Sequence, residues 1–173
     1  MSKSLNGFKA KTVIAVLTMA ACIVAFDMSV VAQTNGDAAV RRVLIEDAVA
    51  FERGDIAALN RIWANDESVL VFESGHANYG WTDYRDNHLV PEMKEMKNTK
   101  YTLSDIIIHM AGTTAWATFK YAISGDIGTR HIDSGGLGTA ILEQRDNRWQ
   151  IVHWHSSARR RAPAQATTPA KKQ

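Results

Sequence analysis

"RWQIVHWHSS", residues 148–157, carries the clearest fold signal in the chain. Its apolar and aromatic residues favour a β-strand, in which side chains alternate between the two faces. His153 and His155 therefore share one face, with Trp154 on the other. Because the chain has only six histidines, the pair indicates either a binding site or hydrogen-bonded residues of the core.

Three more β segments precede this one: "YTLSDIIIHMAG" (101–112), "TAWATFKYAISG" (114–125) and "GTRHIDSGGLGTAILEQ" (128–144). Glycines and the pair Asp146-Asn147 separate the segments, as expected of tight turns. The glycines of "SGGLG" (134–138) predict a bulge or a sharp bend. The second half of the chain thus reads as an antiparallel meander.

The first half is mainly helical. Asp37 is a candidate N-cap for a helix that ends at Gly54, and the apolar residues of this helix recur at helical spacing. They are Val40, Leu44, Ala48 and Phe51. Asp55 caps a second, shorter helix, "IAALNRIWA" (56–64), and "SVLVFES" (68–74) is suited to a strand.

A third helix follows the segment "GHANYG" (75–80). Thr82 or Asp83 is its expected cap, and Tyr84 and His88 lie four residues apart along it. Pro91 predicts a kink. Helices followed by a meander give an α+β fold, in which a curved antiparallel sheet wraps on the N-terminal helices and encloses a cavity.

The N-terminal residues 1–32 are typical of a signal peptide. Three lysines precede the apolar run 12–26, and Ala32 is a small residue before the expected cleavage point. The run is shorter than the roughly 20 residues of a bilayer span, so we expect no stable membrane anchor after cleavage. The alternatives are an uncleaved anchor and lipidation of Cys22. A periplasmic or secreted protein is the expected location.

Charge divides the rest of the chain into two parts. The C-terminal residues 159–173 hold five cations among Ala, Pro, Thr and Gln, a composition that predicts a disordered basic tail. The expected domain, residues 33–158, holds 12 cations against 17 acids, which argues against nucleic-acid binding. Because Cys22 is the only cysteine, the mature chain has no disulfide, cysteine nucleophile or thiolate metal site.

Several segments together resemble a known superfamily. They are "ERGD" (52–55), "VLVFESG" (69–75) and "NRWQIVHWHSS" (147–157). They are similar to the cone-shaped, cystatin-like proteins of the nuclear transport factor 2-like superfamily, which includes SnoaL-like cyclases and ketosteroid isomerase. Within it, residues 101–121 and 146–163 are most similar to the association domain of calcium/calmodulin-dependent protein kinase II and its bacterial relatives.

The resemblance implies a cone with one pocket per subunit and self-association through the open face of the sheet. It does not imply a reaction, because this fold carries enzymes, binders and assembly modules. The kinase association domains place arginines where this chain has Ala140 and Ser156, so their carboxylate-binding arginines are missing. The Asp, Tyr and Asp set of the isomerases cannot be assigned residue by residue.

Candidate pocket residues are histidines, aromatic residues and a few charged neighbours. They are His153, His155, His131, His88, Tyr84, His76, Tyr79, Trp81, Asp133 and Arg85. We expect His153 and His155 to face the interior, with Asp133 as the best carboxylate partner for His131. No tight cluster completes a coordination shell, so we expect no metal, and no cofactor motif is present.

Three functions remain open at this level. The first is an exported protein that binds an unknown small molecule and forms a homodimer or larger oligomer. The second is a SnoaL-like lyase, isomerase or hydrolase that uses pocket histidines as acid and base. The third is a purely structural self-association module.

Overall fold

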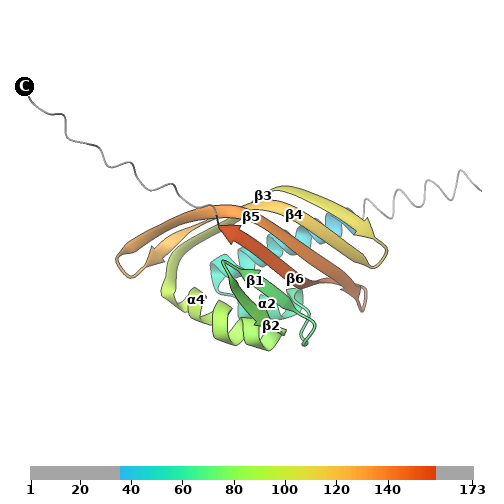
Figure 1. Cartoon of the computed structure of the whole chain (residues 1–173), viewed down its shortest axis with the longest axis horizontal. Coiled ribbons are helices and arrows are strands. Elements are labelled where there is room, and N and C mark those ends of the chain that lie inside the picture. Colours follow the sequence, from blue (N-terminus) through green and yellow to red (C-terminus); the bar gives the residue numbers. More distant parts are fainter. Residues whose placement is uncertain (1–35, 159–173) are drawn as a thin grey trace, which may run out of the picture.

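The computed structural model describes residues 36–158 (Figure 1). The expected signal peptide and basic tail lie outside this range. The described part is an α+β cone: helices lie beneath one face of a strongly curved six-stranded sheet, as predicted. No helix in this range is both long enough and apolar enough to cross a membrane.

The first helix covers residues 36–53 and packs along the concave face of the sheet. The residues predicted to face the core, Val40, Leu44, Ala48 and Phe51, are all buried. Asp37 lies within the helix and pairs with Arg41 at 3.7 Å, so its predicted role as N-cap is wrong. The helix ends as predicted at Gly54, whose φ of 68° favours glycine.

Helix α2 (Ile56–Ile62) follows at once. Asp55 caps it, as predicted, by accepting a hydrogen bond from the Ala58 amide at 2.8 Å. Leu59 and Ile62 are buried, and Trp63 after them is buried as well. The two helices thus meet at one corner and direct their apolar faces to the same core.

The third helical segment is continuous but irregular. It comprises α3 (Trp81–Tyr84), the π-helical turn η1 (Arg85–Leu89) and α4 (Val90–Glu95). Gly80 is its N-cap in place of the predicted Thr82 or Asp83. The irregularity expected at Pro91 takes the form of the π turn just before it, in which the Val90 amide bonds to the Arg85 carbonyl.

The sheet has the order β2-β1-β6-β5-β4-β3. Its strands are β1 (Leu70–Glu73), β2 (His76–Tyr79), β3 (Met96–Ala111), β4 (Thr114–Ile127), β5 (Arg130–Arg145) and β6 (Arg148–Ala158). All neighbours are antiparallel except β1 and β6, which are parallel. The four long strands form the predicted meander.

Two details of the sheet differ from expectation. Strand β2 forms a hairpin with β1 where an irregular connection was expected, with Ser74 and Gly75 at the turn. Of the two alternatives predicted for the glycines of 134–138, the bulge is absent, since β5 keeps its register with β4 along its whole length. These glycines lie where β5 curves over the helices, and a Cβ on Gly138 would collide with the Phe119 ring.

Candidate functional site

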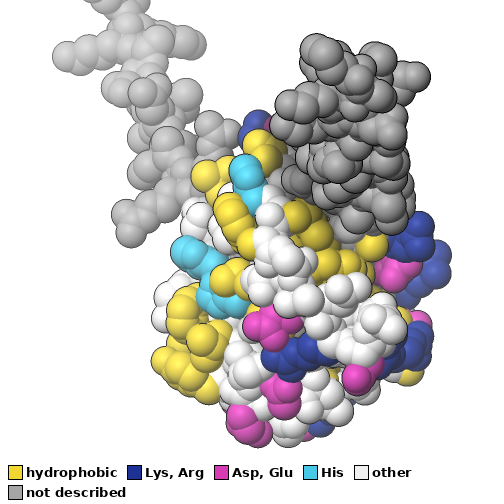
Figure 2. Space-filling view, turned by 90° about the vertical axis from the view of Figure 1, so that its right-hand side faces the viewer, with side chains coloured by type: hydrophobic (Ala, Val, Ile, Leu, Met, Phe, Trp, Pro, Cys, Tyr) yellow, Lys and Arg dark blue, Asp and Glu magenta, His cyan; other side chains and the backbone are white. Residues whose placement is uncertain are grey.

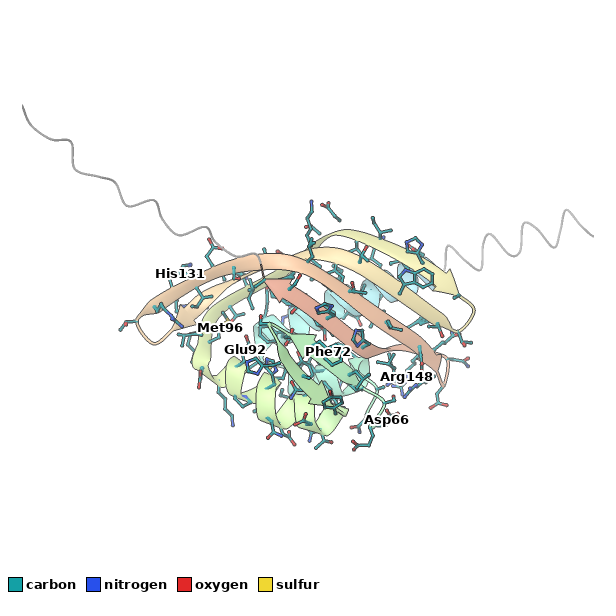
Figure 3. All side chains as sticks on the ribbon, in the orientation of Figure 1. Asp66, Phe72, Glu92, Met96, His131 and Arg148 are labelled. Carbon is teal, nitrogen blue, oxygen red and sulfur yellow. The ribbon has the colours of Figure 1, made fainter. Side chains whose placement is uncertain are left out.

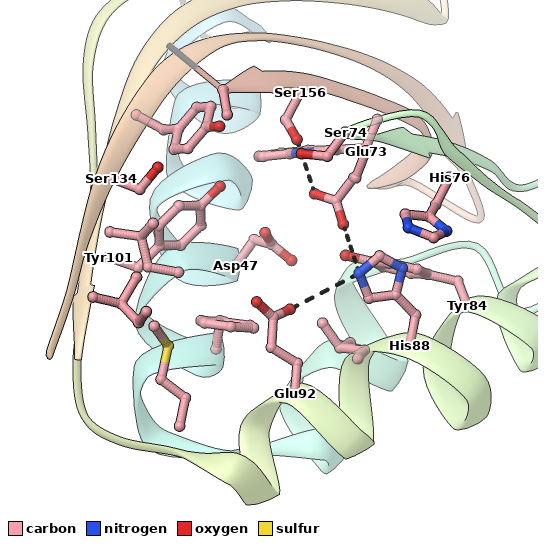
Figure 4. A pocket seen from close by; sticks show the side chains of 18 of the residues that line it. Asp47, Glu73, Ser74, His76, Tyr84, His88, Glu92, Tyr101, Ser134 and Ser156 are labelled. Atoms are coloured by element: carbon pink, nitrogen blue, oxygen red, sulfur yellow. Dashed lines mark hydrogen bonds and ion pairs between the residues drawn. The ribbon is translucent and has the colours of Figure 1, made fainter. Parts of the chain in front are cut away.

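A cavity of about 290 Å³ opens inside the cone. The first helix forms its floor, η1 and α4 form one wall, and β1, β3, β4, β5 and β6 form the others (Figure 4). Acidic, aromatic and hydroxyl side chains converge in it. The labelled ones in Figure 4 include Asp47, Glu73, His88, Glu92, Tyr101 and Ser156.

Asp47 is a buried carboxyl group of the site. It lies on the buried face of the first helix, and only 6% of its surface is exposed. Its Oδ1 accepts a hydrogen bond from Trp63 Nε1 at 2.7 Å, and within the described residues no hydrogen bond reaches Oδ2. Burial, with a smaller contribution from the nearby Glu73 carboxylate, raises the pKa of Asp47 to about 7.

A cluster of three ionisable side chains lies at the wall of the cavity: Glu73, His88 and Glu92. His88 Nε2 lies 3.3 Å from Glu73 Oε2 and 4.0 Å from Glu92 Oε2. Its Nδ1 lies 2.9 Å from Asn78 Oδ1, which orients the ring. Burial raises the pKa of both Glu73 and Glu92, although the Ser156 hydroxyl donates to Glu73 at 3.1 Å.

Three tyrosines supply hydroxyl groups around the carboxyls. Tyr84 packs against the His88 ring, while Tyr101 and Tyr121 contact each other across β3 and β4. Burial and the nearby carboxylates raise the pKa of each. The phenols therefore stay protonated; Tyr84 is hydrogen-bonded to Glu73 and Tyr121 to Ser156, whereas Tyr101 can donate to a bound molecule.

His153 and His155 do share one face of β6, but that face is the outer one. Trp154 and Ser156 point into the cavity instead. The expectation that the two histidines line the interior is therefore wrong. His153 packs edge-on against Phe72 at 5.5 Å between ring centroids, and its pKa is lowered, mainly by burial.

A β-bulge explains this difference. Ile151 pairs with Leu142 and His153 with Ile141, so Val152 is one extra residue in β6. Ile151 and Trp154 both face the core, three residues apart rather than two. Without the bulge, a strand with Ile151 inward would also have placed His153 inward.

His131 and Asp133 also lie outside the cavity. Both are exposed residues of β5, whereas the intervening Ile132 lines the pocket. Figure 3 shows His131 at the end of the β4–β5 hairpin. Its Nδ1 lies 2.8 Å from Asp126 Oδ1, a carboxylate partner that was not predicted.

Only some of the predicted residues in and after the connection before the third helix line the cavity. Trp81 is fully buried and stacks on Trp63, and Tyr79 is 64% exposed. Arg85 forms a double hydrogen bond with Asp86 on the surface. None of these three lines the cavity, whereas Tyr84, His88 and the exposed His76 do.

Sequence reasoning missed the carboxyls. Asp47 looked like a surface residue of an amphipathic helix, and Glu73 looked like a strand end. A signal was nevertheless present, because Asp47 lies between the core positions Leu44 and Ala48 and three residues before Ala50. In the described part of the chain no group of three His, Cys, Asp or Glu residues could hold a metal ion.

Comparison with known proteins agrees with this architecture. The model of the SnoaL-like domain family matches residues 40–160. A protein from Shewanella frigidimarina, named as a candidate ketosteroid isomerase, is 26% identical over 67% of this chain and 92% of its own, with a TM-score of 0.60. No curated protein matches the sequence.

Two further structures share the fold at lower identity. A candidate dehydratase of the nuclear transport factor 2-like family from Streptomyces avermitilis is 17% identical, with a TM-score of 0.64 over 71% of this chain and 96% of its own. Hexachlorocyclohexane dehydrochlorinase LinA-type3 from Novosphingobium barchaimii is 14% identical, with a TM-score of 0.63 over 73% and 88%. The chain belongs to the SnoaL-like domain family and shares its fold with nuclear transport factor 2-like proteins.

Proposed function

We propose that this protein is an acid–base enzyme, an isomerase or lyase, that moves a proton on a small organic molecule held in the cone. The observation that carries the proposal is Asp47, a buried carboxyl with one free oxygen towards the cavity and a pKa of about 7. A group with this pKa exchanges its proton readily near neutral pH, as a general base or acid must.

The surroundings of Asp47 support the same chemistry. Removal of a proton next to a carbonyl leaves negative charge on oxygen, and protonated phenols stabilise such charge by donating hydrogen bonds. Tyr101 lines the cavity and keeps its proton, and Tyr84 beside it is hydrogen-bonded to Glu73. His88, held against Glu73, is placed to return a proton. The proposal therefore keeps the acid–base alternative but assigns the proton exchange to Asp47 in place of His153 and His155.

The similar proteins favour this alternative over binding alone. Their names include an isomerase, a dehydratase and a dehydrochlorinase, and each of these reactions moves a proton from carbon. The cavity volume of about 290 Å³ suits a small substrate. Binding without turnover remains the competing function.

Hydrogen exchange tests the proposal directly. The full chain is incubated in D₂O with small carbonyl, β-hydroxycarbonyl and halogenated compounds, and proton NMR follows exchange, double-bond migration or elimination. We expect turnover that increases as pH rises through about 7, because Asp47 must be ionised to accept a proton. Asp47→Asn should lower kcat/KM by roughly 10²–10⁴-fold. Compounds that bind but show no Asp47-dependent exchange would identify a binder.

Export and self-association complete the proposal. The mature chain is proposed to begin at Gln33 in the periplasm, which the intact mass of the recovered protein tests. The outer face of the sheet is proposed to bind a second copy, because six large hydrophobic side chains are exposed on it. They are Leu70, Phe72, Tyr79, Ile107, Trp116 and Leu137. The resemblance of residues 101–121 to kinase association domains is part of the same proposal.

A further inference from the structure

The charges inside the cone are one-sided. Asp47, Glu73 and Glu92 line the cavity, and no lysine or arginine is among its lining residues. Figure 4 shows the three carboxyl groups directed towards the same central space. A buried anionic cluster without a counter-charge is costly unless its members take up protons or a cation enters.

His88 cannot balance this charge alone. It contacts both Glu73 and Glu92, but a protonated imidazole cancels one negative charge of three. His76 is the other histidine of the lining, and it is exposed at the mouth. The cavity thus keeps an excess of negative charge when its carboxyls are ionised.

The titratable groups come from most of the surrounding elements. The first helix gives Asp47, β1 and β2 give Glu73 and His76, the third helical segment gives Tyr84, His88 and Glu92, and β3 and β4 give Tyr101 and Tyr121. The lining residues of β5 and β6 carry no titratable side chain. Burial raises the pKa of all three carboxyls, and the nearby Glu73 carboxylate adds to the rise at Asp47 and at Glu92.

The walls between these groups are aromatic. Six rings line the cavity: Phe51, Trp63, Tyr84, Tyr101, Tyr121 and Trp154. Aromatic faces attract organic cations through their quadrupole, and the attraction increases when the cation is removed from water. Carboxylates and ring faces thus offer the same kind of ligand two favourable contacts.

We infer that the cone binds a small organic cation, an amine that is protonated at neutral pH. The inference rests on the proposed function and names its substrate class. An anion would meet the carboxylates with no lysine or arginine in the lining to pair with. A neutral molecule would leave the negative charge unbalanced. A protonated amine balances it and permits the carboxyls to ionise.

Calorimetry with three matched probes tests the inference on the full chain. Benzylammonium, benzyl alcohol and benzoate have nearly the same shape and differ in charge. We expect benzylammonium to bind at least tenfold more tightly than benzyl alcohol at pH 8, and benzoate to bind most weakly. The advantage should decrease towards pH 5.5 as Asp47 takes up a proton. Titration in two buffers with different ionisation enthalpies should show proton release only with benzylammonium.

Variants locate the charge that is responsible. Glu73→Gln should weaken benzylammonium binding about tenfold and change benzyl alcohol binding less than twofold. Glu46→Gln is the matched control, because Glu46 is an exposed acid of the first helix outside this cavity. Equal losses in both variants would overturn the inference. If Glu73→Gln does not fold, the ranking of the three probes on the unaltered chain still decides.

The inference fails if benzyl alcohol or benzoate binds as tightly as benzylammonium, or if none of the three binds. The proposed function fails separately, when cations bind with the expected ranking but no compound undergoes Asp47-dependent exchange. Affinity thus tests the substrate class, and turnover tests the reaction.

Discussion

Asp47 shows how one buried carboxyl gives this fold its chemistry. The first helix directs it into the core beside Trp63, whose indole donates the single hydrogen bond to its Oδ1. One hydrogen bond does not replace the hydration that an ionised carboxylate loses, so the neutral form is favoured. In the proposed reaction, the residue that costs stability at neutral pH is also the one that accepts a proton from a substrate.

The free energy of unfolding should depend on pH because of this cost. The folded chain keeps a proton on Asp47 up to about pH 7, whereas the unfolded chain loses it near 3.8. Ionisation of Asp47 therefore costs the folded chain nothing below pH 3.8. As pH rises from 3.8 to 7, the free energy of unfolding declines by on the order of 4 kcal/mol. Asp47→Asn should match the parent protein near pH 4, exceed it in stability at pH 8, and flatten the profile between. Urea denaturation at several pH values measures this.

Asp66 provides a control of opposite sign. Hydrogen bonds from Ser68, and more weakly from Arg145, lower the pKa of Asp66. Asp66→Asn should therefore remove stability that is present above the unfolded pKa and lost in acid. A variant of Asp47 with the same pH profile as the parent would contradict the account of its burial.

At the scale of single residues, the sequence predicted which side chains share a face of a strand but not whether that face is the inner or the outer one. The spacing of His153 and His155 correctly predicted a shared face. It could not reveal the bulge at Val152, because a bulge depends on the register with β5 rather than on local pattern. Asp47 was missed for a related reason. A single acidic residue next to core positions is expected on the surface, and its burial depends on tertiary contacts that the local sequence does not show.

At the scale of elements, the helices and four long strands were predictable because caps and turns are local. Asp55, Gly54 and the Asp146-Asn147 turn all act through neighbouring residues. Strand β2 was missed because "HANY" is short and has little apolar character. It is a strand because it forms an antiparallel ladder with β1, not because of its own residue pattern. That hairpin positions Glu73, so the missed strand is also part of the site.

The curvature of β5 yields a prediction at the same scale. Gly138 leaves room for the Phe119 ring, and a methyl group there would collide with it. Gly138→Ala should destabilise the chain by about 1–3 kcal/mol through overpacking. Phe119→Leu in the same chain should recover part of the loss, because the two sites share one space. Thermal unfolding of the single and double variants measures the coupling, and strictly additive losses would contradict this account.

At the scale of the whole molecule, the cone separates an acidic cavity inside from an apolar sheet face outside. Figure 2 shows hydrophobic side chains and histidines gathered on one flank, with most charged side chains on the other. Across the strands, Trp116 pairs with Ile141 and stacks on His109. An exposed apolar face of this kind is the basis of the proposed self-association.

The proposed partner, a second copy, gives a testable assembly. Trp116→Glu should convert a dimer to a monomer at micromolar concentration, because an unpaired carboxylate would be buried in the interface. Ile45→Glu is the control, since Ile45 is similarly exposed but lies on the first helix. Light scattering after gel filtration distinguishes the two variants. A monomeric parent protein, or equal dissociation by both variants, would contradict dimerisation through the sheet.

The central claim is that Asp47 is a proton-exchanging carboxyl inside a cation-binding cone, and its own titration tests this most directly. Carbon-13 NMR of the full chain labelled at aspartate carboxyls, assigned with Asp47→Asn, follows this group through the pH range. We predict a midpoint near pH 7 that moves to lower pH when benzylammonium is added. A midpoint near the ordinary value of 3.8, unchanged by the cation, would contradict the account.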